Sequence, residues 1–193
     1  MVLAYHLTFG AYGFWLPNDP RGSWSKYVGS QQLYALGSAT KTISRESQAH
    51  AERDHEVQQS AKAALLFPPV IFTGEQARAV GNGFRLAVSE ADYRVYACAV
   101  MPDHMHLVVA SHERHVKRIV SHLKAKASMK LHGALWPFDD DRPVWERGGW
   151  AVFLNDLSMV FNAIRYVEAN PIREGLPAQR WSFVEAFHGP RES

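Results

Sequence analysis

An α+β fold is predicted by three features of the sequence. Two strand-like runs, 93–101 and 104–110, flank the turn residues Pro102 and Asp103, which predicts an antiparallel hairpin. Segments with the apolar spacing of amphipathic helices lie before and after this hairpin. The 193 residues are 47% hydrophobic and 21% charged, which is typical of one globular domain with a sizeable core.

The first strand is predicted at residues 5–9. These residues alternate between an apolar face and a face that carries His6 and Thr8. The segment 28–66 that follows is polar and rich in Ala, Gln and Ser, with a thin apolar stripe from Ser44 onward. We expect it to form a peripheral insertion with some helix.

A helix is predicted to start after Thr73. Thr73 and Gln76 have the spacing of a capping box, in which each side chain bonds the backbone N–H of the other residue. Apolar residues follow at helical spacing over 77–91. Gly81 and Gly83 are expected to weaken this helix, because glycine lowers helix propensity.

Two histidines lie one residue apart in the returning strand of the hairpin. His104 and His106 project from the same face, opposite the apolar face formed by Met105 and its neighbours. Two imidazoles on one face can hold a cation. The alternative is a half-buried strand that carries histidines at ordinary polar positions, so the motif needs a second site to support it.

A basic amphipathic helix is predicted over 116–131. Its apolar positions are Val116, Ile119, Val120, Leu123, Ala127 and Leu131. Around them lie six basic residues that are candidates for binding a phosphate backbone: Arg114, Lys117, Arg118, Lys124, Lys126 and Lys130. A solvated helix face explains the same charges equally well.

The region between this helix and the last one offers weaker signals. Residues 144–153 predict two short strands or one bulged strand, because Gly148 and Gly149 interrupt the run. The acidic triplet at 139–141 is expected to be a solvated loop and not a metal site.

The last helix is predicted over 156–169. Its buried stripe is expected to consist of Leu157, Val160, Phe161, Ile164 and Val167. Tyr166 lies about 180° from Leu157 on a helical wheel and is expected to face away from that stripe. Asn170 lies one turn further on the same side, and Pro171 is expected to end the helix. Tyr166 is then either a cover for a neighbouring element or a working residue.

The compartment is suggested by composition. A single cysteine, Cys98, cannot form an internal disulfide, which favours a reducing interior. The apolar start of the chain lacks a basic leader, so we expect neither a signal peptide nor a membrane span. The net charge of +2 does not by itself indicate a protein that binds nucleic acid.

Two separated motifs carry a family resemblance. The run 101–109 (MPDHMHLVV) followed by the run 165–176 (RYVEANPIREGL) resembles the single-tyrosine HUH transposases. That family includes insertion-sequence transposases and REP-associated tyrosine transposases. The resemblance extends from the first strand to about residue 176 and leaves only the insertion without a counterpart.

The resemblance implies a ferredoxin-like antiparallel sheet with helices packed mainly on one face, and a single domain over 1–176 with a tail at 177–193. It implies that His104 and His106 bind a divalent metal, Mg²⁺ or Mn²⁺, with Asn170 as third ligand. Tyr166 is then the nucleophile that forms a 5′-phosphotyrosine with single-stranded or hairpin DNA. A cytoplasmic, nucleoid-associated protein is expected.

Several alternatives stay open at this point. The chain could be a domesticated protein that binds hairpin nucleic acid without cutting it, or a hydrolase that uses only the histidine pair. His6 could join the site from its neighbouring strand. Trp145, Trp150 and Trp181 could stack on bases, although core packing is the simpler explanation. A homodimer is possible.

Overall fold

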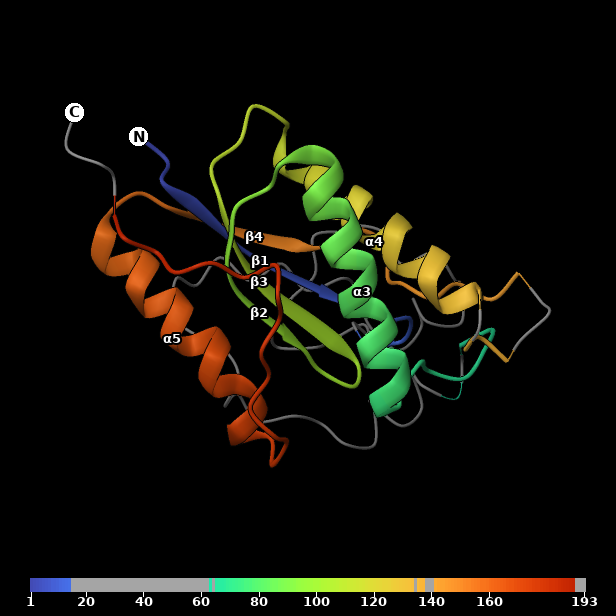
Figure 1. The fold of residues 1–193 in the computed structure, drawn as a ribbon. Helices are drawn as coiled ribbons and strands as arrows, with labels where there is room; N and C mark the ends of the chain where they lie inside the picture. Colours follow the sequence, from blue (N-terminus) through green and yellow to red (C-terminus); the bar gives the residue numbers. More distant parts are fainter. Residues whose placement is uncertain (15–62, 64, 134, 138–140, 190–193) are drawn as a thin grey trace.

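The computed structural model describes residues 1–14, 63, 65–133, 135–137 and 141–189 (Figure 1). Almost all of the predicted insertion at 28–66 lies outside the described residues, as do two of the three acidic residues at 139–141. None of the described helices is long and apolar enough to cross a bilayer.

Within the described part of the chain, four strands form one antiparallel sheet in the order β2-β3-β1-β4. The strands are β1 (Ala4–Gly10), β2 (Val95–Val100), β3 (His104–Ala110) and β4 (Trp150–Leu154). The predicted hairpin is present, and the Met101 N–H donates to the His104 carbonyl across its turn at 2.8 Å. With a helix between β1 and β2 and another between β3 and β4, the arrangement is α+β and ferredoxin-like, as expected.

Helices cover both faces of the sheet. Helices α3 (Gly74–Ala91) and α4 (Val116–His132) pack together on one face, in a core that includes Leu7, Phe84 and Leu123. Helix α5 (Leu157–Arg173) covers the opposite face, in a second core that includes Val108 and Val167. Figure 1 shows α5 on the far side of the sheet from α3 and α4. Two of these three helices share a face, and α5 has the other face to itself.

The start of α3 confirms the predicted capping box. The Gln76 N–H donates to the Thr73 hydroxyl at 3.2 Å, and the Thr73 N–H donates to the Gln76 side-chain oxygen at 2.9 Å. The two glycines of this helix have a packing role. A Cβ at Gly83 would lie 2.4 Å from the Ala127 Cα, and a Cβ at Gly81 would overlap the Trp181 ring. Glycine therefore allows α4 and the C-terminal segment to lie close to α3.

The substitution Gly83→Ala is expected to lower the free energy of unfolding by about 1–3 kcal/mol, the usual cost of overpacking a core. The clash with the α4 backbone outweighs the roughly 1 kcal/mol gained from the better helix propensity of alanine. Urea denaturation measures the change. Gly74→Ala is the control, because a Cβ there would meet no other part of the described structure within 4 Å beyond its own turn of helix. Equal stability of the two variants would contradict this explanation of Gly83.

Helix α4 has the buried stripe that its sequence predicts. All six predicted apolar positions are buried, from Val116 at the first turn to Leu131 at the last. The region before β4 is simpler than expected: one strand begins at Trp150, preceded by an isolated bridge between Ala11 and Trp145. Trp145 is a packing residue, because its ring contacts Phe9 and its indole N–H donates to the Ser128 hydroxyl at 2.8 Å.

The described part of the predicted tail runs along the free edge of β2. The Gln179 amide bonds both the N–H and the carbonyl of Val100, and the Glu185 N–H donates to the Val95 carbonyl. The Phe187 ring packs on Tyr96. These contacts cover an edge that would otherwise expose unpaired backbone groups.

Candidate active site

The face of the sheet beneath α5 carries the two histidines of the predicted motif. Strand pairing places Thr8 opposite His106 and Gly10 opposite His104 on β1, while Ala99 lies opposite His106 on β2. Directly paired residues project from the same face. The cross-strand neighbours of the two histidines are therefore small, which leaves room for the imidazole rings beneath the helix.

Three rings from three elements meet at this face. The ring centroids of His6 and His106 are 5.2 Å apart, those of His106 and Tyr166 are 5.5 Å apart, and those of His6 and Tyr166 are 5.7 Å apart. The His104 ring lies 4.9 Å from His106. The structure thus brings the predicted nucleophile to the two histidines of the predicted motif within one chain, and it adds His6.

In both motif histidines the ring nitrogen Nδ1 is engaged in hydrogen bonds. The His104 Nδ1 lies 2.7 Å from the Asp103 Oδ1. The His106 Nδ1 lies 3.0 Å from the Thr8 hydroxyl and 3.1 Å from the His6 Nε2. Among the described residues, neither Nε2 atom has a hydrogen-bond partner. This is the arrangement of ligating histidines, whose second nitrogen is held by a carboxylate or another polar group.

An aromatic side chain packs on the outer histidine. The Phe14 ring is stacked on His104, with centroids 4.7 Å apart and planes 20° apart. A Cβ at Gly10 would lie within 2.6 Å of two atoms of the Phe14 side chain. Glycine at this position therefore lets Phe14 lie against β1 and hold the His104 ring.

Helix α5 buries only part of the stripe that the sequence predicts: Val160 and Val167 are buried, but two other members are not. Leu157 and Phe161 are 42% and 46% exposed, whereas Ala163 and Asn170 are buried. The helix also continues through Pro171 to Arg173, so Asn170 lies inside it. Its rotation about its own axis turns Tyr166 toward the sheet, and the prediction that Tyr166 faces away from the core is wrong.

Asn170 is buried without a partner for its amide nitrogen among the described residues, whereas Tyr166 lies against a cation. Asn170 is only 7% exposed, and its Nδ2 is buried without a hydrogen-bond partner in the described structure. The Arg173 guanidinium lies over the Tyr166 ring, 5.7 Å from its centroid. A buried amide nitrogen without a hydrogen-bond partner is costly, so Asn170 is the least satisfied polar side chain of α5 in the described structure.

Burial sets the protonation of the rings. It lowers the pKa of His6 to about 4 and, with the charges of His104 and His6, holds the pKa of His106 well below its usual range. Burial also raises the pKa of Tyr166, against the opposing charge of Arg173. At neutral pH both inner imidazoles are therefore neutral, which is the form that binds metal, and the phenol keeps its proton.

Acid is expected to destabilise the metal-free protein through these histidines. The folded-state pKa of His6 lies below its unfolded value of about 6.5, so the unfolded chain binds more protons below that pH. The free energy of unfolding should be constant near pH 7 and fall by about 1 kcal/mol per pH unit from His6 alone as the pH drops from 6.5 to 4. Urea denaturation in chelator measures this slope. His6→Leu should flatten it, and an unchanged slope would contradict the assignment.

The six predicted DNA-binding residues do not gather at the histidine site. They lie on or just before α4, which packs on the opposite face of the sheet. The Arg114 guanidinium donates to the Tyr93 hydroxyl, and Lys126 pairs with Glu90 at 2.7 Å. Arg118 and Lys130 are exposed. The charged stripe is thus partly engaged within the protein.

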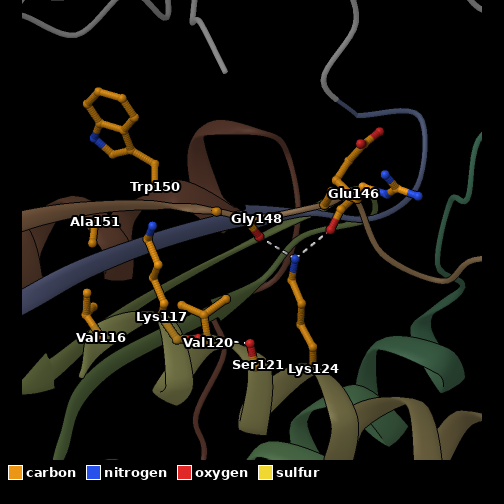
Figure 2. A pocket seen from close by; sticks show the side chains of 11 residues that line it. Val116, Lys117, Val120, Ser121, Lys124, Glu146, Gly148, Trp150 and Ala151 are labelled. Atoms are coloured by element: carbon orange, nitrogen blue, oxygen red, sulfur yellow. Dashed lines mark hydrogen bonds between the residues drawn. The ribbon is translucent and has the colours of Figure 1, made fainter. Parts of the chain in front are cut away.

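Lys117 and Lys124 line a cavity beside the edge strand β4 (Figure 2). The Lys124 ammonium donates to the Glu146 and Gly148 carbonyls and lies 5.3 Å from the centroid of the Phe9 ring. Burial lowers its pKa to about 8. Lys124 therefore fixes the loop before β4.

In the described part of the chain, no three His, Cys, Asp or Glu side chains form a metal-binding cluster. A cation at this face would rely on the paired imidazoles together with an amide and oxygens from outside the protein. The contact between β1 and β3 that recruits His6 joins residues 100 positions apart. Its only sequence signal was the shared polar face of His6 and Thr8.

The chain is similar to one family of known proteins and to two solved structures. Residues 69–170 match the family model described as IS200-like transposase. A solved REP-associated tyrosine transposase bound to a REP hairpin shares 11% identity, over 91% of this chain and 70% of that one, with a TM-score of 0.48. A protein from Deinococcus radiodurans R1, named as a candidate transposase, shares 14% identity over 92% and 94% of the two chains, with a TM-score of 0.46. No curated protein sequence matches the chain.

Proposed function

The chain belongs to the IS200-like transposase family, and on that premise we propose that it cuts and rejoins single-stranded DNA with Tyr166 as the nucleophile. One observation carries this proposal: the Tyr166 ring lies 5.5 Å from His106, on the same face of the sheet as His104. Both rings belong to one chain, so the proposed site needs no side chain from a second copy.

The residues at this face fit a divalent cation. The Nε2 atoms of His104 and His106 are the available imidazole ligands, since each Nδ1 is already engaged. Asn170 can add an oxygen, because rotation of its amide exchanges the buried unpartnered nitrogen for the carbonyl oxygen. Imidazole is a better ligand for Mn²⁺ than for Mg²⁺, so we propose Mn²⁺ as the tighter of the two expected metals. When bound, the metal polarises a DNA phosphate as a Lewis acid.

The proposed reaction exchanges one phosphoester bond for another. The Tyr166 oxygen loses its proton to solvent and forms a bond to the scissile phosphorus. The bond from phosphorus to the 3′ oxygen breaks, and that oxygen takes up a proton and leaves as a 3′-hydroxyl. The 5′-phosphotyrosine that remains stores the bond energy, so a second 3′-hydroxyl can reverse the step without net hydrolysis.

We propose that His6 and Thr8 orient the His106 ring for this task. An imidazole that ligates through Nε2 carries its proton on Nδ1, and both the Thr8 hydroxyl and the His6 Nε2 lie where they can accept it. The His6 ring also contacts Tyr166. His6 is thus a positioning residue that links the metal ligand to the nucleophile.

His6→Leu is expected to weaken Mn²⁺ binding by about 10- to 100-fold, the usual loss when a partner of a ligating histidine is removed. Isothermal titration calorimetry measures the affinity. His6→Gln is the matched control, because its amide can accept the same proton and should restore most of the affinity. Thr8→Val should show a smaller loss. If His6→Leu bound Mn²⁺ as tightly as the unmodified protein, this positioning role would be wrong.

The proposed function is tested by trapping the covalent intermediate. The protein is incubated with Mn²⁺ and a labelled single-stranded oligonucleotide that contains a hairpin, then denatured and separated by electrophoresis. We expect a labelled protein band that depends on the metal and disappears in chelator. Cut DNA without a protein adduct would favour a hydrolase, and binding without cutting under Mn²⁺ or Mg²⁺ would favour a DNA-binding protein.

A further inference from the structure

A cavity of about 430 Å³ lies between the start of α4 and the edge strand β4 (Figure 2). Its size falls within the range of pockets that hold small organic ligands. Val116, Val120 and Ala151 supply apolar wall, and Ser121 and the backbone of 146–149 supply polar groups. A cavity with apolar walls and few polar groups suits a ligand that has a flat apolar part with hydrogen-bonding edges.

The charge of this cavity favours an anionic ligand. Its lining contains Lys117, Lys124 and Arg147 against one acidic residue, Glu146, which is a net charge of +2. The Glu146 carboxylate accepts a hydrogen bond from the Gly13 N–H at 2.7 Å, which directs it toward the turn that follows β1. A phosphate would therefore be attracted to this wall.

The wall is held in place by contacts within the protein. The Lys124 ammonium donates to the carbonyls of Glu146 and Gly148, two further residues of the lining (Figure 2). A Cβ at Gly149 would lie 3.1 Å from Phe9 and 3.2 Å from the Thr8 carbonyl, so the loop fits closely against β1. The site is therefore preformed, which lowers the entropic cost of binding.

The cavity and the histidine face adjoin across β4. Trp150 pairs with Thr8, so its side chain emerges on the same face as the Thr8 hydroxyl that contacts His106. The next residue, Ala151, points to the opposite face and lines the cavity. A DNA strand that leaves the proposed catalytic site over this edge reaches the cavity after passing Trp150.

We infer that this cavity holds one unpaired nucleotide of the DNA strand next to the cleavage point. The base lies against the apolar wall, and its phosphate lies near Lys117 and Arg147. The inference rests on the proposed function, since it takes the strand at the histidine face to be DNA. It assigns the cavity a role in positioning the strand and none in the chemistry.

Abasic substitutions combined with cavity variants test this inference. A fluorescent hairpin with single-stranded flanks carries one abasic site at a time, and fluorescence anisotropy in chelator measures its affinity without cleavage. Ser121→Leu fills the cavity from the exposed side of α4. Ala125→Leu, one turn further on the same helix and outside the lining, is the matched control.

We expect one abasic position to weaken binding to the unmodified protein by about tenfold, as for loss of one base contact. Ser121→Leu should lose the same tenfold with intact DNA and nothing more with that abasic DNA, because both changes remove one contact. Lys117→Ala should reduce the slope of log affinity against log salt concentration by about 1. Lys130→Ala should leave the abasic position that weakens binding unchanged.

The inference would be overturned if Ser121→Leu bound every oligonucleotide with the affinity of the unmodified protein. It would also be overturned if the loss of affinity caused by Ser121→Leu multiplied the loss caused by each abasic site, at every position. The adduct assay separates this outcome from failure of the proposed function. Ser121→Leu should still form the adduct at saturating DNA. Coupling without any adduct from the unmodified protein would overturn the proposed cleavage and leave the cavity assignment in place.

Discussion

Tyr166→Phe is expected to abolish the covalent protein–DNA adduct, with a loss of at least about 10³-fold in its rate of formation. The variant removes only the phenolic oxygen. Its ring should keep the contacts with His6 and His106, so the folded structure should persist. Gel electrophoresis of the labelled adduct after denaturation measures the loss, and thermal denaturation checks that the variant is folded.

The matched control for this substitution is Tyr5→Phe. Tyr5 lies on β1 directly beside His6, but its ring packs against Phe153 and makes no ring contact with Tyr166. Tyr5→Phe should form the adduct at the normal rate. If Tyr166→Phe formed as much adduct as this control, the nucleophile would have to be another residue and the proposed mechanism would be wrong.

Local patterns predicted the elements on one face of the sheet well. The capping box at Thr73 and the six buried positions of α4 need only neighbours within one or two turns, and the structure has both. The hairpin around Pro102 follows from adjacent strands and a turn. In these segments one apolar face meets one core, so the sequence period and the burial agree.

The same reasoning succeeded only in part for α5, because this helix covers a face that is not uniformly apolar. The sheet beneath it presents small residues and histidines, and the helix approaches them with Ala163 and Asn170 while Leu157 stays 42% exposed. Counting apolar residues therefore predicted the burial of Val160 and Val167 correctly and that of Leu157 and Phe161 wrongly. Tyr166 was predicted as a site residue from its motif, and its true direction depends on this packing.

The histidine cluster shows a second limit. Spacing alone placed His104 and His106 on one face, but it could not place His6 beside them, since that requires the register between β1 and β3. Likewise, the sequence shows how many charged residues α4 carries but not which partner each of them contacts. Whether Lys126 meets Glu90 or solvent depends on how α3 and α4 pack.

His106→Asn is expected to weaken metal binding more than a change at His6 or Thr8, the residues that hold its ring. The asparagine amide occupies the place of the ring's Nδ1, so it can keep the contacts with Thr8 and His6, but it has no atom in the position of Nε2. We expect Mn²⁺ affinity to fall by more than about 100-fold, beyond the loss typical of an outer-shell partner. Calorimetry measures the affinity, and the adduct assay should show a comparable loss.

The control for this variant is His132→Asn, which changes an exposed histidine at the end of α4 that stacks on Trp136. It should bind Mn²⁺ and form the adduct normally. Because the proposed metal is held through Nε2, Mn²⁺ should raise the melting temperature of the unmodified protein and of His132→Asn, but not that of His106→Asn. If Mn²⁺ raised the melting temperature of His106→Asn as it does that of the unmodified protein, the cation would bind elsewhere. The proposed role of the histidine pair would then be wrong, even if Tyr166 remained the nucleophile.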